Sequence, residues 1–124
     1  MVQNTLRSLS LHNFGALYNL QGNYSQAETF YRKALGMREK ALGLKHPDVA
    51  ATLTGLAVSY SYQGRYTEAT PLVKRALEIN EKTFGPDHPT VLKLSQDYSN
   101  LLRKVGRTKE AAEARAKAIR PGAK

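Results

Sequence analysis

The sequence contains no cysteine and no tryptophan among its 124 residues. Without cysteine the chain has no disulfides, no zinc–thiolate sites and no thiol nucleophile. No apolar run approaches the roughly 20 residues of a membrane-spanning helix, and the N-terminus lacks the basic and apolar blocks of a signal peptide. We therefore expect a cytoplasmic protein without a membrane segment.

Acidic residues are also scarce. Asp and Glu number 10 against 19 Lys and Arg, which gives a net charge of +9. Between Lys93 and Lys124, nine basic residues stand against three acidic ones. Because the summed charge of a surface attracts ligands of opposite sign, the C-terminal third of the chain favours an acidic partner. The alternative on charge alone is a solvated, basic terminal helix.

The sequence lacks the motifs of catalytic and cofactor sites as well. It has no glycine-rich phosphate loop and no Gly-x-Ser-x-Gly turn, and its carboxylates form no pair suited to acid–base chemistry. The three histidines have no metal-ligand spacing, because His46 and His88 occupy equivalent turns and His12 is expected on the exposed side of a helix. These absences predict a protein that is not an enzyme and has no cofactor or metal site.

An internal repeat of 42 residues organises the chain. Shifting the sequence by 42 residues aligns 14 identical positions out of 42, among them Gln21-Gly22 with Gln63-Gly64 and His46-Pro47 with His88-Pro89. A third copy keeps Gly106 in the same register. A repeat of this length is typical of helical solenoids, in which each copy packs against the next.

Within each copy the apolar spacing is helical. Leu11, Phe14 and Tyr18 follow one face of a helix, and the glycine that comes next permits the left-handed turn that ends it. Ser25 and Glu28 then fit a capping box at the start of a second helix. We expect six antiparallel helices near residues 5–20, 25–42, 47–62, 67–84, 89–104 and 109–120.

The pattern Leu11-x2-Phe14-Gly15-x2-Tyr18, followed by Gly22-x-Tyr24-x2-Ala27-x6-Ala34, resembles the tetratricopeptide repeat. The repeat length and the segment from Ala76 to Pro89 resemble the long repeats of kinesin light chains. The resemblance implies an all-α solenoid of three helix-turn-helix units, a right-handed superhelix with a concave groove. We assign residues 1–124 to one repeat domain, with units near 5–46, 47–88 and 89–120 and a tail at 121–124.

The resemblance also implies a scaffold that binds a protein or peptide, because the first helix of each tetratricopeptide unit lines the concave groove. The face of these helices that lies opposite the packing seam carries amides, one tyrosine and, in the third unit, positively charged residues. Amides can hydrogen-bond an extended backbone and cations can hold carboxylates, so an acidic peptide is favoured. The predicted groove residues are His12, Asn13, Ala16, Asn19, Thr54, Val58, Tyr62, Lys93, Gln96, Asn100, Arg103 and Lys104.

Two other functions stay open. The first helix has no polar cap and carries Leu6, Leu9 and Leu17, which predicts weak homo-oligomerisation through this helix, or a purely structural assembly role. The basic C-terminal third predicts weak, sequence-independent nucleic-acid binding. This alternative is less favoured, since most aromatic residues are expected in helix contacts and few remain to stack on bases.

Overall fold

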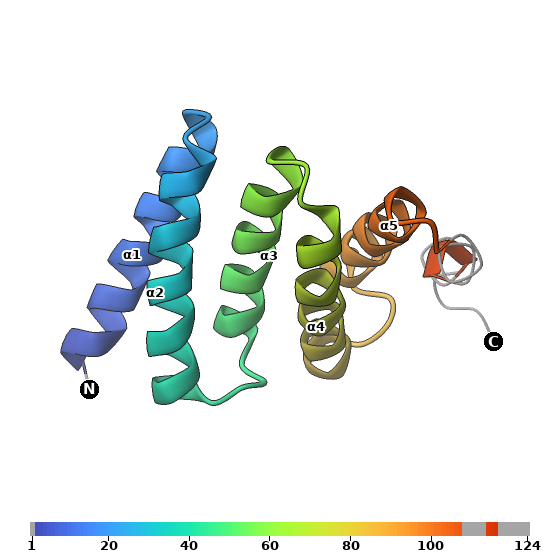
Figure 1. The fold of residues 1–124 in the computed structure, drawn as a ribbon. Helices are drawn as coiled ribbons and strands as arrows, with labels where there is room; N and C mark the ends of the chain where they lie inside the picture. Colours follow the sequence, from blue (N-terminus) through green and yellow to red (C-terminus); the bar gives the residue numbers. More distant parts are fainter. Residues whose placement is uncertain (1, 108–113, 117–124) are drawn as a thin grey trace.

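The computed structural model describes residues 2–107 and 114–116, with side chains from residue 6 onward. In this part the chain forms five helices that lie side by side in sequence order, with α1 and α5 at opposite ends of the row (Figure 1). Each helix packs against the next, and α1 also contacts α3. The helices are α1 (Val2–Leu20), α2 (Tyr24–Leu42), α3 (Pro47–Tyr62), α4 (Tyr66–Phe84) and α5 (Pro89–Lys104).

The predicted helix bounds agree with the structure to within one residue for α2 to α5, whereas α1 begins earlier than residue 5. The sixth predicted helix, 109–120, lies outside the described residues apart from 114–116, which are helical. The all-helical prediction is confirmed for the described residues, which contain no strand.

The turns follow from the repeated glycines and histidines. The glycines that end the helices have positive φ angles, for example 80° at Gly22 and 89° at Gly43, which side chains with a Cβ rarely adopt. The Nδ1 atoms of His46 and His88 accept hydrogen bonds from the amides of Asp48 (3.0 Å) and Thr90 (3.1 Å). Each histidine therefore caps the helix that begins at the next proline, which agrees with its predicted place in a repeated turn.

The predicted capping box at Ser25 is wrong. Helix α2 begins at Tyr24, and its N-cap, Asn23, makes no side-chain capping bond. Ser25 lies inside the helix, where its carbonyl accepts a bond from the Thr29 hydroxyl. Glu28 turns instead toward the second unit, where the Arg65 guanidinium forms a stronger, charge-assisted bond than a backbone amide provides.

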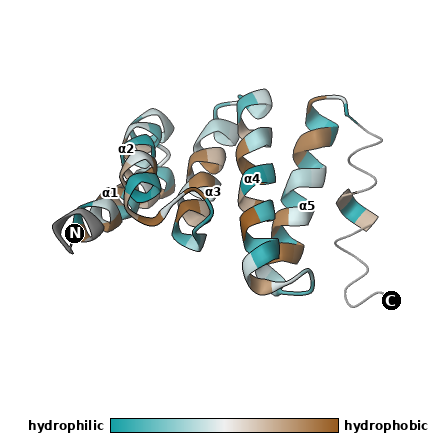
Figure 2. Cartoon of the chain, turned by 90° about the horizontal axis from the view of Figure 1, so that it is seen from below, coloured by the Kyte–Doolittle hydropathy of each residue, from teal (hydrophilic) through white to brown (hydrophobic). Residues whose placement is uncertain are grey.

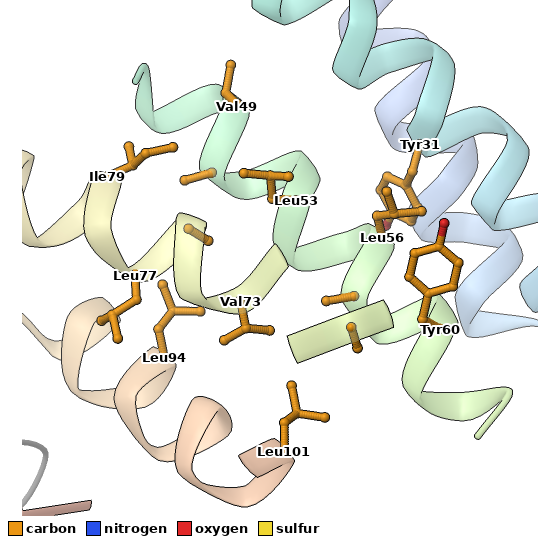
Figure 3. Close-up of a cluster of buried hydrophobic side chains, with 14 of the residues drawn as sticks. Tyr31, Val49, Leu53, Leu56, Tyr60, Val73, Leu77, Ile79, Leu94 and Leu101 are labelled. Carbon is orange, nitrogen blue, oxygen red and sulfur yellow. The ribbon is translucent and has the colours of Figure 1, made fainter. Parts of the chain in front are cut away.

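The hydrophobic core lies between the helices. Seen from below, the helices again form a row, and hydrophobic segments of α3 and α4 lie between their neighbours (Figure 2). A seam of small residues on α2 and α4 is buried, with Ala27, Ala34, Ala69 and Ala76 inaccessible to solvent. Larger side chains fill the space around this seam (Figure 3): Tyr31, Leu53, Leu56, Tyr60, Val73, Leu77, Ile79, Leu94 and Leu101.

Tyr31 has a special place in this core because two glycines make room for it. A Cβ atom added at Gly15 would lie 2.9 Å from the Tyr31 ring, and one added at Gly55 would lie 2.5 Å from it. Both distances are shorter than packed carbon atoms tolerate, so only glycine fits at these positions. The Tyr31 ring of α2 thereby packs against α1 on one side and against α3 on the other.

Candidate peptide-binding groove

A cleft of about 430 Å³ opens between α3 and α5. It brings together two of the predicted groove residues, Thr54 of α3 and Lys93 of α5, while Asn80 and Phe84 of α4 line it between them. The complete lining is Pro47, Ala51, Thr54, Asn80, Phe84, Thr90, Lys93, Leu94 and Asp97. The cleft combines apolar surface with a few polar side chains, as ligand-binding clefts commonly do.

The predicted cations of α5 differ in how far they are neutralised. Lys93 forms an ion pair with Asp97 at 3.2 Å, so its charge is partly cancelled. Arg103 donates hydrogen bonds to the side chains of Asn100 and Ser99. The Lys104 ammonium lies 5.0 Å from the centre of the Tyr66 ring. Arg103 and Lys104 are both exposed at one end of α5, and neither pairs with a carboxylate among the residues that the structure describes.

Tyr62 provides an exposed aromatic surface at the matching end of α3. Its side chain is 67% exposed, and its ring stacks on Tyr24 with the centroids 4.8 Å apart and the planes nearly parallel. One turn earlier, Val58 is also exposed. The stacked pair holds Tyr62 in place, so its outer face is available without rearrangement. Of the remaining predicted residues, Gln96 is half-buried and Asn13 is exposed.

On α1, two of the predicted groove residues belong instead to the contact between the first and second units. His12 is half-buried, against the prediction of an exposed position: its Nδ1 lies 3.2 Å from the Thr52 hydroxyl and its ring meets Tyr31 edge-on. The Asn19 amide donates to the Gly55 carbonyl at 3.3 Å and accepts from Ser59 at 2.8 Å. Ala16, between them on the helix, is half-buried too.

His12 makes the stability of the fold depend on pH. Burial, assisted by the charge of Arg38 and opposed by Asp48, lowers its pKa below the ordinary value of 6.5. The folded state therefore prefers the neutral ring, and its stabilising effect is complete above pH 6.5 and is lost as the pH falls below that value. We expect the urea midpoint to fall between pH 7.5 and pH 5.5, and to fall less in His12→Gln. An equal fall in both proteins would contradict this assignment.

Sequence reasoning missed a charged network across the same contact. Glu28 accepts from Arg65 at 2.8 Å, Arg32 at 3.1 Å and Gln63 at 3.4 Å. Burial would raise the pKa of Glu28, but the hydrogen bonds from Gln63 and Arg32 and the charge of Arg65 hold it below its ordinary value. The carboxylate therefore stays ionised and links α2 to the turn after α3.

A second ion pair crosses the same contact farther along α2. Glu39 meets Arg75 of α4 at 2.6 Å, and Arg75 also donates to the Leu44 carbonyl at 3.1 Å. The partners are 36 residues apart in the sequence. The only signal for such a pair in the sequence is opposite charge about one repeat apart, and this is too common to single it out.

Comparison with known proteins agrees with this architecture. The sequence model of the tetratricopeptide repeat matches residues 6–82 and again residues 55–120. The chain belongs to the tetratricopeptide repeat family. Repeats of this family generally mediate protein–protein interaction. The predicted solenoid of tetratricopeptide units, with its likeness to kinesin light chains, is thus confirmed.

Solved tetratricopeptide structures superpose closely on this chain. The repeats of a putative kinesin light chain from Podosopora anserina share 25% identity with a TM-score of 0.78, over 91% of this chain and 54% of that one. BtubC (BKLC) from P. vanneervenii has a TM-score of 0.85 at 19% identity, over 93% of this chain and 45% of that one. The Arabidopsis FLU domain has a TM-score of 0.79 at 19% identity, with 94% of each chain covered.

A curated relative matches a shorter part of the tetratricopeptide chain. A nucleotide-binding leucine-rich repeat (NLR)-like protein from Hyaloscypha variabilis is 45% identical over 51 residues, which is 41% of this chain. The chain spans 5% of that relative and about half of the kinesin light chain repeat structure. Within residues 2–107 and 114–116, no helix is long and apolar enough to cross a membrane, and no group of three or more His, Asp or Glu side chains could hold a metal ion.

Proposed function

We propose that this tetratricopeptide chain is a non-enzymatic scaffold that binds an extended acidic peptide along α3 and α5. The observation that carries the proposal is that apolar, aromatic and positively charged surfaces follow one another along these two helices. A partly apolar cleft lies near their N-terminal ends, and an exposed tyrosine and two exposed cations lie at their C-terminal ends. The predicted role of α1 in this groove is reduced, because His12 and Asn19 are engaged inside the protein.

The two helices would hold the peptide by different means along its length. The apolar rim of the cleft and Val58 would cover apolar side chains, and Tyr62 would offer a ring for stacking. The Asn100 oxygen accepts from Arg103, and its amide group would donate to a ligand carbonyl. Arg103 and Lys104 would pair with carboxylates. Exposed ion pairs contribute about 0–1 kcal/mol each, so we expect a dissociation constant on the order of micromolar that weakens with salt.

Reversal of the two exposed cations tests this site. Arg103→Glu with Lys104→Glu should weaken the binding of a fluorescein-labelled peptide of Glu and Ala residues by at least about tenfold, because attraction becomes repulsion. Both side chains are exposed, so the melting temperature should change little. Fluorescence anisotropy gives the affinity, and the same peptide with Gln in place of Glu measures the part that is independent of charge.

A matched reversal on α4 is the control. Lys74 and Lys82 are exposed there, and Lys74→Glu with Lys82→Glu makes the same change in net charge away from the site. This variant should keep the affinity of the wild type. If both double variants lose binding equally, the groove is excluded. Parallel titration with a single-stranded DNA oligonucleotide then shows whether the basic surface binds nucleic acid instead, with a steep dependence on salt.

A further inference from the structure

The outer side of α1 and α2 corresponds to a surface that is buried elsewhere in the chain. Advancing by 42 residues places Arg7 on Val49, Phe14 on Leu56 and Leu17 on Ser59. In α3 these equivalents are at most 3% exposed, because they pack against the preceding unit. In α1, Phe14 is 49% exposed and Leu17 is 48% exposed. The same helical face is therefore covered in the second unit and open in the first.

Leu20 supports the same correspondence. Its equivalents in the next two units are Tyr62 and Lys104, and each lies over the aromatic residue that begins the second helix of the preceding unit. Tyr62 stacks on Tyr24, and Lys104 lies over Tyr66. Leu20 is 87% exposed, which is the exposure expected for this position when no aromatic ring lies under it.

The charged part of the contact also has its counterpart. Lys33 is equivalent to Arg75, which binds Glu39 and the Leu44 carbonyl of the preceding unit. Beside Lys33 lies an open cleft of about 620 Å³, lined by Arg7, Leu11, Arg32, Lys33, Gly36, Met37 and Lys40. The equivalent cleft on α4 is closed on one side by Leu44 and Lys45, the turn that leaves the first unit.

We propose that this outer face, formed by Arg7, Phe14, Leu17, Leu20, Lys33 and Met37, docks another helical hairpin of the same 42-residue type. Its partner carries a carboxylate where the first unit has Glu39, an apolar turn residue where it has Leu44 and an aromatic residue where it has Tyr24. These three features complement Lys33, the open cleft beside Met37, and Leu20. The proposal is independent of the groove on α3 and α5.

A second copy of this chain is a poorer occupant than such a hairpin. If two outer faces met, Arg7, Lys33 and Lys40 would approach the same cations of the other copy, which opposes contact. By sequence register, the third unit has Ala123 where the first unit has Glu39, and Thr108 where it has Tyr24. Neither supplies the carboxylate or the ring. We therefore expect any self-association through α1 to be confined to high concentration.

A chain lengthened by one repeat tests the docking. In this variant Met1–His46 is followed directly by Thr5–Lys124, so that a copy of the first unit precedes the native one. Docking predicts a single thermal transition with a midpoint about 5 °C or more above that of the parent, since each added interface stabilises a repeat array. The added copy presents the same outer face, so the exposed end is unchanged in the comparison.

Charge reversal identifies the contact. Glu39→Lys in the first copy should lower the melting temperature by about 2 °C, and Lys33→Glu in the second copy should restore it. Lys74→Glu is the control and should restore nothing. Two separate transitions, an unchanged midpoint or an absence of restoration would overturn the proposal. So would a micromolar dimer of the parent chain in sedimentation, because a second copy would then be the natural occupant.

Discussion

Replacement of Tyr31 by alanine is expected to lower the free energy of unfolding by about 3–5 kcal/mol, the usual cost of removing a large buried ring. The side chain is 3% exposed and is enclosed by Gly15 of α1 and Gly55 of α3. Its loss would leave a cavity in the contact between three helices. Domains of this size are commonly stable by about 5–15 kcal/mol, so much of the fold's stability would be lost. Urea unfolding followed by circular dichroism measures the change.

Tyr62→Ala is the matched control, because it removes the same atoms from a ring that is 67% exposed. It should cost about 1 kcal/mol, the value of one stacked pair. Gly55→Ala tests the same contact from the other side, since its Cβ would lie 2.5 Å from the Tyr31 ring. Combining it with Tyr31→Val, which copies the equivalent Val73, should be less harmful than the sum of the two single changes. Simple additivity would contradict the proposed fit between ring and glycine.

Replacement of Arg38 by alanine is expected to cost about 3 kcal/mol. Arg38 is 6% exposed, and its guanidinium donates to the Asp48 carbonyl at 3.0 Å and to the Thr52 hydroxyl at 2.9 Å. Hydrogen bonds from a charged donor contribute about 1.5–3 kcal/mol each, and the packed stem of the side chain is lost as well. Arg75→Ala removes an ion pair across the same contact, but the Arg75 side chain is 34% exposed. This change should therefore lower the free energy of unfolding by only about 1 kcal/mol.

A second measurement separates the charge of Arg38 from its bulk. The guanidinium helps to lower the pKa of His12, so Arg38→Ala should raise that pKa while Arg75→Ala leaves it unchanged. Titration of the His12 ring followed by NMR reports the effect directly. A destabilised Arg38→Ala protein whose His12 pKa is unchanged would show that Arg38 acts through packing alone.

The repeat made the fold predictable. A residue that recurs after 42 positions must serve each unit in the same way, and the shared glycines and His-Pro pairs therefore located the turns closely. Helix bounds at Pro47 and Pro89 were predicted correctly because proline and the preceding histidine act within a few residues of each other. Such local physics is visible in one sequence without knowledge of distant contacts.

The candidate site was less predictable, because each of its residues depends on a neighbour from another unit. The sequence places the side of α1 that carries His12 and Asn19 at the groove, but α3 packs close enough to half-bury His12 and to hydrogen-bond with Asn19. Glu28 was assigned to a cap because its position fits one, and Arg65 then proved to be the stronger partner. Periodicity gives the direction of a side chain to within a broad arc, and the packing angle between helices decides what it meets.

The contact between the first and second units, here called the first junction, differs in its buried residues from the second junction, between the second and third units. Thr52 and Ser59 are buried where the second unit meets the first, whereas their equivalents in the third unit are Leu94 and Leu101. The first junction therefore adds hydrogen bonds and ion pairs to the apolar burial around Tyr31 and Leu56, whereas the second buries leucine at the positions equivalent to Thr52 and Ser59. Apolar burial weakens on cooling, while the cost of dehydrating charges falls on heating. We therefore expect acid to weaken the first junction through His12 and Glu28, and cooling to weaken the leucine contacts of the second.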